Sequence, residues 1–283
     1  MADILYINGR YTTTDEKVIG VEDRGFQFGD GVYEVIKFLD RHLLFVDGHY
    51  RRLMSGLEEI EIPNPWDADS FSEMCRRLLE RTAFMDGILY IQVTRGEAER
   101  ALFYPEDLEP TAIAYTRRFP FPDATKKERG VGVITMPDIR WKHCNVKSIN
   151  LLANAIARKK AQRAEAYEVL LMDSEMDVRE GASSSFFAVR ESRLVTHPTG
   201  PAILPGIVRH EVISLALAEK IRVDERPVHE YELYSLDEAF ITSTTQGVMP
   251  VTHVDGRPLG SGRRGEITRL LQERFDALER SSR

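Results

Sequence analysis

Apolar residues recur every three or four positions in two stretches of the first half of the chain, 49–60 and 71–84. This spacing places them on one face of an α-helix, so each stretch is predicted to form an amphipathic helix. Runs rich in β-branched and aromatic residues flank these helices and predict strands. The predicted strands are 32–38, 43–46, 88–94 and 111–115.

The chain is predicted to open with a β-hairpin. Two short runs with strand-like residues, Ile4–Ile7 and Arg10–Thr12, are separated by Asn8-Gly9. An Asn-Gly pair readily takes the positive φ angles of a tight hairpin turn.

A stretch rich in proline and charge, 119–130, interrupts the pattern and is typical of an exposed connection between domains. The boundary is placed near Phe121, which gives a smaller domain at 1–120 and a larger cofactor-binding domain at 121–283. Helix and strand alternate again beyond it, so the predicted fold class is α+β with two domains. Strands are predicted at 131–136, 168–172, 185–189 and 239–242, and helices at 149–164, 208–219 and 265–278.

Charge and cysteine content exclude several classes of function. The net charge of −7 opposes general nucleic-acid binding, which needs Lys and Arg clustered on one face. Cys75 and Cys144 provide neither a disulfide framework nor a zinc site, so no metal is expected and a reducing cytoplasm is predicted. The sequence shows neither a secretory signal nor a run of about eighteen apolar residues, so neither export nor a membrane span is expected.

Physical reasoning without reference to known families yields a candidate residue rather than a function. The sequence contains no phosphate loop of Walker or Rossmann spacing and no nucleophile elbow. Lys147 lies in a mostly uncharged run just before a predicted helix. A lysine desolvated in this way can attack aldehydes to form Schiff bases, whereas most lysines are simply solvated charges.

Five separated segments resemble the family of D-amino-acid transaminases and branched-chain aminotransferases, the fold type IV group of pyridoxal-phosphate enzymes. The resemblance covers nearly the whole chain and implies a D-amino-acid aminotransferase-like fold with the site between two domains. It also implies a homodimer in which a loop of the second subunit completes each site. The segments are Glu22–Val35, Ile139–Ser148, Glu180–Ser185, Leu204–Ile207 and Thr242–Thr245.

The resemblance implies that Lys147 holds pyridoxal 5′-phosphate as a Schiff base and then moves a proton between the substrate Cα and the cofactor. Glu180 matches the acidic residue that faces the pyridine nitrogen and keeps it protonated. Leu204 matches a leucine that packs against the cofactor ring. Ser183, in the same segment as Glu180, is also assigned to cofactor binding.

Phosphate binding is assigned to Arg52, Thr244 and the start of a predicted helix. Ile207 and Val208 are expected to donate their backbone N–H groups at the positive end of that helix. Arg52 and Thr244 stand at positions that the family uses for phosphate, where they would add a charge-assisted bond and a hydroxyl donor. Some relatives carry a threonine where this chain has Val208, so one hydroxyl contact is expected to be missing.

Substrate recognition is assigned to two further regions. Val32–Lys37 resembles the D-amino-acid version of the family motif, and within it Tyr33 and Val35 are expected to contact the substrate. Arg100 matches an arginine that grips the substrate α-carboxylate from the neighbouring subunit, with Tyr33 as its hydroxyl partner. Leu102 replaces the usual histidine, which removes a hydrogen bond worth roughly 1.5–3 kcal/mol and is expected to widen substrate tolerance.

The leading hypothesis is a ping-pong transaminase that moves the amino group of a D-amino acid, such as D-alanine, to 2-oxoglutarate or another 2-oxo acid. Because Leu102 weakens the carboxylate signature, a branched-chain L-amino-acid transaminase or an (R)-amine transaminase stays open. An aminodeoxychorismate lyase shares the fold, but its motif differs from Tyr33–Val35. A catalytically silent binding protein would bind no aldehyde at Lys147.

Overall fold

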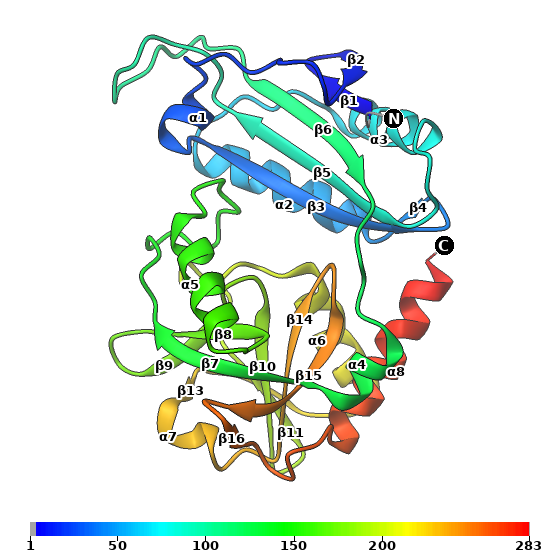
Figure 1. Ribbon diagram of the computed structural model, residues 1–283, viewed down its shortest axis with the longest axis vertical. Coiled ribbons are helices and arrows are strands. Elements are labelled where there is room, and N and C mark those ends of the chain that lie inside the picture. The colour runs from blue at the N-terminus through cyan, green and yellow to red at the C-terminus, as the bar shows by residue number, and fades with distance from the viewer. Residues whose placement is uncertain (1–3, 283) are drawn as a thin grey trace. The chain divides into compact units, whose positions relative to one another are not determined.

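The computed structural model describes residues 4–282, which form two compact units (Figure 1). The first unit runs to Pro120 and also includes Val146–Asn150. The second comprises Phe121–Asn145 and Leu151–Ser281. Lys147 lies within the sequence range expected for the C-terminal domain, yet it packs with the first unit.

The first unit is built on a six-stranded antiparallel sheet in the order β2-β1-β6-β5-β3-β4. Asn8 and Gly9 both have positive φ, so the predicted opening hairpin is confirmed. The prediction of a strand over 43–46 is mostly wrong, because a helix begins at Val46. The strands are β1 (Ile4–Ile7), β2 (Arg10–Thr13), β3 (Gly31–Leu39), β4 (His42–Leu43), β5 (Gly87–Thr94) and β6 (Thr111–Arg117).

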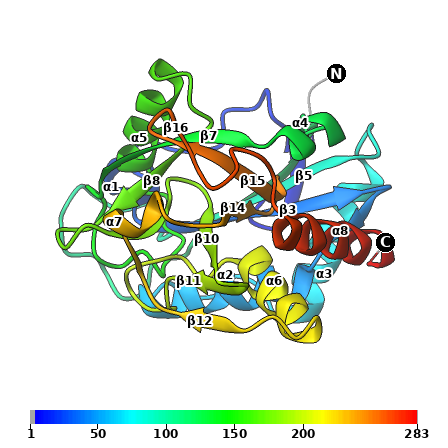
Figure 2. The ribbon, with the colours of Figure 1, turned by 90° about the horizontal axis from the view of Figure 1, so that it is seen from below.

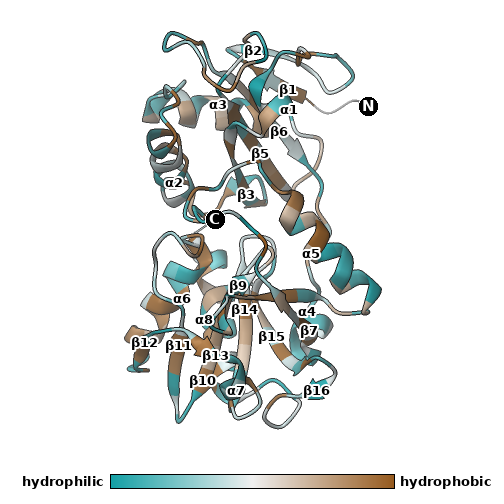
Figure 3. Cartoon of the chain, turned by 90° about the vertical axis from the view of Figure 1, so that its left-hand side faces the viewer, coloured by the Kyte–Doolittle hydropathy of each residue, from teal (hydrophilic) through white to brown (hydrophobic). Residues whose placement is uncertain are grey.

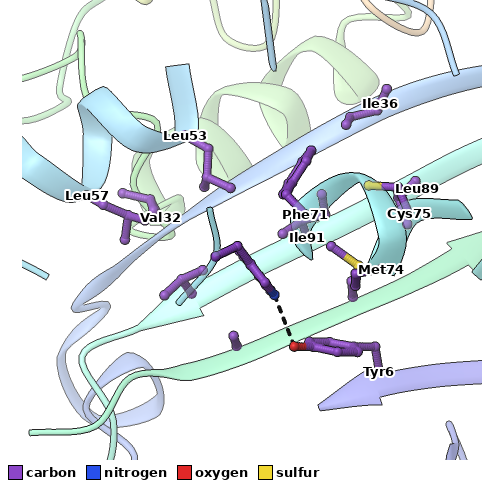
Figure 4. Packing of buried hydrophobic residues seen from close by; sticks show 14 of the residues in the cluster. Tyr6, Val32, Ile36, Leu53, Leu57, Phe71, Met74, Cys75, Leu89 and Ile91 are labelled. Carbon is purple, nitrogen blue, oxygen red and sulfur yellow. Dashed lines mark hydrogen bonds between the residues drawn. The ribbon is translucent and has the colours of Figure 1, made fainter. Parts of the chain in front are cut away.

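Three helices belong to this unit: α1 (Arg24–Phe28), α2 (Val46–Glu59) and α3 (Ala68–Glu80). Helices α2 and α3, the two predicted from apolar spacing, lie on one side of the sheet (Figure 3). Their apolar residues fill a core against alternate residues of the strands, and each fully buried large side chain contributes roughly 1.5–3 kcal/mol. Figure 4 shows this packing, in which the Tyr6 hydroxyl accepts a hydrogen bond of 3.0 Å from the Trp66 indole.

The second unit contains a larger mixed sheet in the order β12-β11-β10-β14-β15-β7-β8-β9-β13, with β16 paired to β15. Strand β7 runs parallel to both β8 and β15, and β11 runs parallel to β12; the other pairs are antiparallel. The strands are β7 (Val131–Pro137), β8 (Glu168–Met172), β9 (Asp177–Gly181), β10 (Ser185–Arg190), β11 (Arg193–Thr196), β12 (Val223–Glu225), β13 (Val228–His229), β14 (Glu238–Ser243), β15 (Gly247–Val254) and β16 (Arg257–Pro258).

The helices of the second unit are α4 (Ala124–Arg129), α5 (Leu152–Arg163), α6 (Ile207–Ala218), α7 (Glu230–Leu233) and α8 (Glu266–Ser281). Helices α6 and α8 pack together and both contact β14 (Figure 2). The mixed α+β class is confirmed in both units. Among residues 4–282, none of the helices is long and apolar enough to cross a membrane.

Candidate active site

Lys147 lies beside the start of β3 in the first unit. Its carbonyl accepts a hydrogen bond of 3.0 Å from the Tyr33 N–H, and Ser148 forms a β-bridge with Val32. The side chain is half-buried, and its Nζ lies 4.2 Å from the centre of the Tyr33 ring. Because the face of an aromatic ring attracts a cation, Tyr33 helps to fix the position of the lysine amine.

Tyr33 and Val35 project from the face of the sheet opposite to α2, since alternate strand residues point to opposite faces. The ring of Tyr33 stacks on Tyr90 with centroids 5.8 Å apart, and Tyr90 stacks on Tyr115 at 5.1 Å. Burial raises the pKa of Tyr90, so its hydroxyl stays neutral and donates to Gln92 Oε1 at 2.8 Å. These side chains form a half-buried aromatic surface next to Lys147.

Arg52 is bound by a buried glutamate on the helix face of the same strand. Glu34 accepts from Arg52 Nε at 2.6 Å and Nη2 at 2.9 Å, and His49 Nδ1 donates to it at 2.7 Å. Burial opposes ionisation of Glu34, but Arg52 and His49 together hold its pKa well below the usual range. Burial lowers the pKa of His49 despite the neighbouring carboxylate. The pair of bonds fixes the plane of the Arg52 guanidinium.

Arg100 and Leu102 lie on the loop between β5 and β6, and both are exposed. The Arg100 guanidinium lies 4.6 Å from the centre of the Phe28 ring. Leu102 is 86% exposed, and Phe103 is 83% exposed. The loop therefore presents one cation and two large apolar side chains to its surroundings.

Glu180 is buried at the end of β9 in the second unit and is also paired with an arginine. Its Oε1 accepts from Arg140 Nη1 at 2.5 Å, and both of its oxygens lie 3.2 Å from the Leu204 N–H. Arg140 gives its Nε and Nη2 donors to Asp138, at 3.0 and 2.9 Å. Burial raises the pKa of Glu180 to about 6, although Arg140 opposes the shift.

Ser183 is tied to a second buried carboxylate. Its hydroxyl donates to Glu168 Oε2 at 2.7 Å, and Ser184 contacts the same oxygen at 3.2 Å. Arg158 pairs with the other oxygen of Glu168 at 2.9 Å. The structure therefore brings Glu180 and Leu204 together, whereas the contact it assigns to Ser183 is with Glu168.

Ile207 and Val208 are the first two residues of α6, as the sequence pattern predicted to within one residue. The residue before them, Gly206, makes no side-chain cap, so the first N–H groups of the helix are available for an anion. A Cβ at Gly206 would lie 2.7 Å from the Ser185 hydroxyl, so a larger residue there would have to displace that side chain. Thr244 lies in the turn after β14, the strand on which α6 packs.

Two buried polar atoms lie on either side of Thr244 in the sequence, one near the end of β14 and one in the turn after it. Thr242 Oγ1 and Gln246 Oε1 are buried and have no hydrogen-bond partner among residues 4–282. Buried polar groups are nearly always hydrogen-bonded, so such atoms point to a missing partner. The Thr242 hydroxyl can donate a hydrogen bond, and together with the uncapped α6 it fits a site for a phosphate-bearing cofactor. The described residues contain no cluster of three His, Cys, Asp or Glu side chains that could hold a metal.

Sequence reasoning did not assign the partners that hold the candidate residues in place. Glu34 and His49 hold Arg52, while Arg140 and Asp138 hold Glu180. One available signal was the spacing of His49 and Arg52, three residues apart on one face of a predicted helix. No signal in the sequence links Arg140 to Glu180, which lies forty residues further along the chain.

Comparison with known proteins gives a match over most of the chain. The family model for amino-transferase class IV matches residues 31–254. A D-alanine aminotransferase from Bacillus licheniformis is 40% identical over 266 residues, which cover 94% of this chain and 93% of that protein. One from Staphylococcus epidermidis is 37% identical over 273 residues, covering 96% of each chain.

Solved structures with the same fold include branched-chain amino acid aminotransferases. That of Escherichia coli has a TM-score of 0.92 and 25% identity, and the match covers 98% of this chain and 95% of that one. The enzyme of T.th., complexed with N-(5′-phosphopyridoxyl)-L-glutamate, has a TM-score of 0.91 and 23% identity, with 100% and 96% covered.

Proposed function

Because this chain belongs to the class IV aminotransferases, we propose that it transfers the amino group of a D-amino acid, such as D-alanine, to 2-oxoglutarate or another 2-oxo acid. The observation that carries this proposal is the 40% identity to a D-alanine aminotransferase over 94% of the chain. The cofactor is pyridoxal 5′-phosphate. The reaction is ping-pong, since donor and acceptor use the same cofactor in turn.

Bound pyridoxal phosphate supplies an aldehyde that combines with amines and a ring that accepts the electron pair of the substrate Cα–H bond. Lys147 provides the amine that binds the aldehyde and the base that moves the Cα proton. The Tyr33 ring keeps the lysine amine next to the aromatic surface of the sheet. Val35 borders the same surface and limits the space for the substrate side chain.

Phosphate recognition combines charge with aligned backbone donors. Arg52, held in plane by Glu34, offers a guanidinium edge. The N–H groups of Ile207 and Val208 at the start of α6 provide donors, together with the Thr244 hydroxyl. A doubly charged phosphate is favoured where a helix N-terminus and an arginine both contribute.

Glu180 is proposed to accept a hydrogen bond from the protonated pyridine nitrogen. The bond from Leu204 to its Oε2 is long, at 3.2 Å, so this oxygen retains capacity for a stronger donor. The contact between the Leu204 N–H and Glu180 supports the proposal that Leu204 packs on the ring. Ser183 would act on the cofactor only through its contact with Glu168.

The protein is proposed to be a homodimer in which Arg100 serves the site of the partner subunit. The exposed Leu102 and Phe103 beside Arg100 support this, because large apolar side chains on a loop are favoured when another surface covers them. Mixing Lys147→Ala subunits with Arg100→Ala subunits should then restore activity at low D-alanine concentration, because one site of each hybrid dimer is intact. Failure of hybrids to gain activity would place Arg100 in its own subunit's site.

The cytoplasm is the proposed compartment. Cys75 and Cys144 are both free thiols and both buried. Burial raises the pKa of Cys75 to about 12 and that of Cys144 to about 11, so neither forms a reactive thiolate.

A branched-chain L-amino-acid or (R)-amine transaminase is the second candidate, favoured by Leu102 in place of the usual histidine. The deciding experiment mixes cofactor-loaded protein separately with D-alanine, L-leucine and (R)-1-phenylethylamine and follows loss of the cofactor's visible absorbance. Fast conversion by D-alanine alone supports the D-amino-acid proposal. Faster conversion by either of the others would replace it.

A further inference from the structure

The loop at 96–104, which carries Arg100, is attached to a buried ionic cluster of Arg24, Asp30 and Arg95. The two arginines are 3% and 5% exposed. Asp30 Oδ2 accepts a hydrogen bond from the Nε atom of each, at 2.9 Å in both cases. One carboxylate thus serves two buried guanidinium groups.

Arg24 holds the loop at its first residue and again near its middle. Its backbone N–H donates to the Gly96 carbonyl at 2.9 Å, and its Nη1 donates to the Ala101 carbonyl at 2.7 Å. The planar guanidinium can bond a carboxylate and a loop carbonyl at the same time, which a lysine ammonium at the end of a flexible chain cannot reproduce. Gly96 itself has φ +97°, and a Cβ there would lie 2.0 Å from the Glu109 carbonyl oxygen. The chain therefore begins the loop with a conformation that requires glycine.

Arg95 connects the same cluster to the end of α2 and to the far end of the loop. Its Nη1 and Nη2 donate to the carbonyls of Glu61 and Ile60, at 2.9 and 2.7 Å. Its guanidinium lies 3.7 Å from the centre of the Tyr104 ring, and that of Arg24 lies 5.1 Å from the same ring. Tyr104 is therefore held between two buried cations.

The cluster also reaches Arg100 through Phe28. The Phe28 ring centre lies 4.7 Å from the Arg24 guanidinium and 4.6 Å from that of Arg100. Phe28 is the last residue of α1, a helix capped at its start by Asp23. Arg100 thus rests on a ring whose position depends on α1 and Arg24.

Two buried guanidiniums that share one carboxylate are poorly explained by stability alone, because desolvation of charges often cancels their attraction. Fixing the shape of a loop is the better explanation. We propose that Arg24 is a positioning residue that sets the location of Arg100 and thereby the affinity for the substrate α-carboxylate. This inference rests on the proposed role of Arg100 in substrate binding.

The first test compares cofactor-loaded wild type with Arg24→Lys, which keeps the charge but loses the planar fork. The KM for D-alanine should rise about tenfold or more while kcat changes less than about threefold, as expected when substrate binding alone is weakened. Arg76→Lys, on the exposed face of α3, is the control and should leave both constants unchanged. A purely structural role would lower the active fraction, so a fall in kcat at constant KM overturns the proposal.

The second test measures hydrogen exchange of the backbone and needs no substrate. Arg24→Lys should speed exchange within 97–104 but not within β5, since only the loop loses its anchor. If wild type does not transaminate D-alanine, the proposed function fails while this measurement still decides whether Arg24 holds the loop. Faster exchange with an unchanged KM would show that the anchor does not position Arg100, and would also overturn the proposal.

A pair of variants at Tyr104 applies if Arg24→Lys does not fold. Tyr104→Phe keeps the ring between the two arginines and should preserve the KM for D-alanine. Tyr104→Leu removes the ring and should raise that KM. Equal KM values for the two variants would contradict the proposal.

Discussion

Glu34 of the first unit and Glu180 of the second are both buried and both paired with an arginine, yet the pKa values of the two carboxyl groups shift in opposite directions. Glu34 of the first unit receives two bonds from Arg52 and one from His49, and its pKa is held below the usual range. Glu180 of the second unit receives one bond from Arg140, and burial raises its pKa to about 6. Both side chains are almost fully buried, so burial alone does not explain the difference.

The two carboxylates differ in the positive charge and in the number of hydrogen-bond donors that face them. Arg52 directs two of its donors at Glu34, whereas Arg140 gives two of its donors to Asp138 and one to Glu180. Opposite charge and hydrogen bonds lower a carboxyl pKa, and desolvation raises it. Glu34 therefore stays charged and holds Arg52 in place. Glu180 can instead accept a hydrogen bond from a protonated partner such as a pyridine nitrogen.

The largest effect is expected for substitution of Lys147, because neither glutamate can replace its amine. Lys147→Ala should lower kcat by more than about 1,000-fold, since proton transfer by a positioned group alone contributes roughly 10²–10⁴. The visible absorbance of the bound cofactor should be lost as well. Lys142→Ala, an exposed lysine of the same segment, is the matched control. An active, yellow Lys147→Ala protein would refute the assignment.

The contrast between the glutamates should next be visible in stability. Glu34→Gln should lower the free energy of unfolding by roughly 3–5 kcal/mol, because it removes the negative charge from a buried ion pair with Arg52. Glu180→Gln should cause no comparable loss, because Arg140 keeps both bonds to Asp138. Urea unfolding of both variants at one pH measures the difference, and equal losses would break the comparison.

Catalytic activity should show the opposite order, because the loss on substitution should be larger for Glu180 than for Glu34. Glu180→Gln removes a charge-assisted bond worth roughly 1.5–3 kcal/mol, so kcat should fall on the order of 10- to 100-fold. Cofactor binding should persist, because Lys147 and the phosphate contacts are unchanged. A kcat within twofold of wild type would mean that Glu180 does not face the pyridine nitrogen.

Much of the fold could be predicted, because long periodic elements leave a strong pattern. Helices α2 and α3 show apolar residues every three or four positions, and β5 is a run of β-branched and aromatic residues. Strands β9, β12 and β13 were missed because they are short and rich in polar and charged residues, so they lack the apolar pattern of a strand. Strand β15 was missed because Pro250 interrupts it, and proline normally argues against an inner strand.

In the candidate site, too, some residues could be predicted from the sequence and others could not. Lys147 and Arg52 could be singled out by resemblance to family motifs, and the start of α6 could be placed from its glycine. The ionic partners could not, since Glu34 with Arg52 and Glu180 with Arg140 depend on register and on distant contacts. Resemblance identifies the chemical group, whereas its protonation depends on neighbours that only the fold brings together.

The pH dependence of stability can sharpen the comparison. The pKa of Glu180 rises from 4.5 to about 6 on folding, so between these values the folded state binds more protons than the unfolded state. The buried carboxylate thus costs stability above pH 6 and not below pH 4.5. In cofactor-free protein, the stability of Glu180→Gln relative to wild type should be greater at about pH 7.5 than at about pH 5, by on the order of 1–2 kcal/mol. A gap that does not change with pH would contradict the raised pKa.

The smallest effect is expected next to Arg100, which is exposed and is not held by a buried carboxylate among residues 4–282. Arg100 is exposed and rests on the Phe28 ring, so its grip on a substrate carboxylate depends on what stands beside it. Leu102→His restores a hydrogen-bond donor there and should lower the KM for D-alanine by about three- to tenfold, as one modest hydrogen bond allows. Phe103→His, equally exposed and one residue further along, is the control and should not lower it. If both variants lower KM alike, an imidazole at either position of the loop is sufficient, and Leu102 does not determine substrate choice.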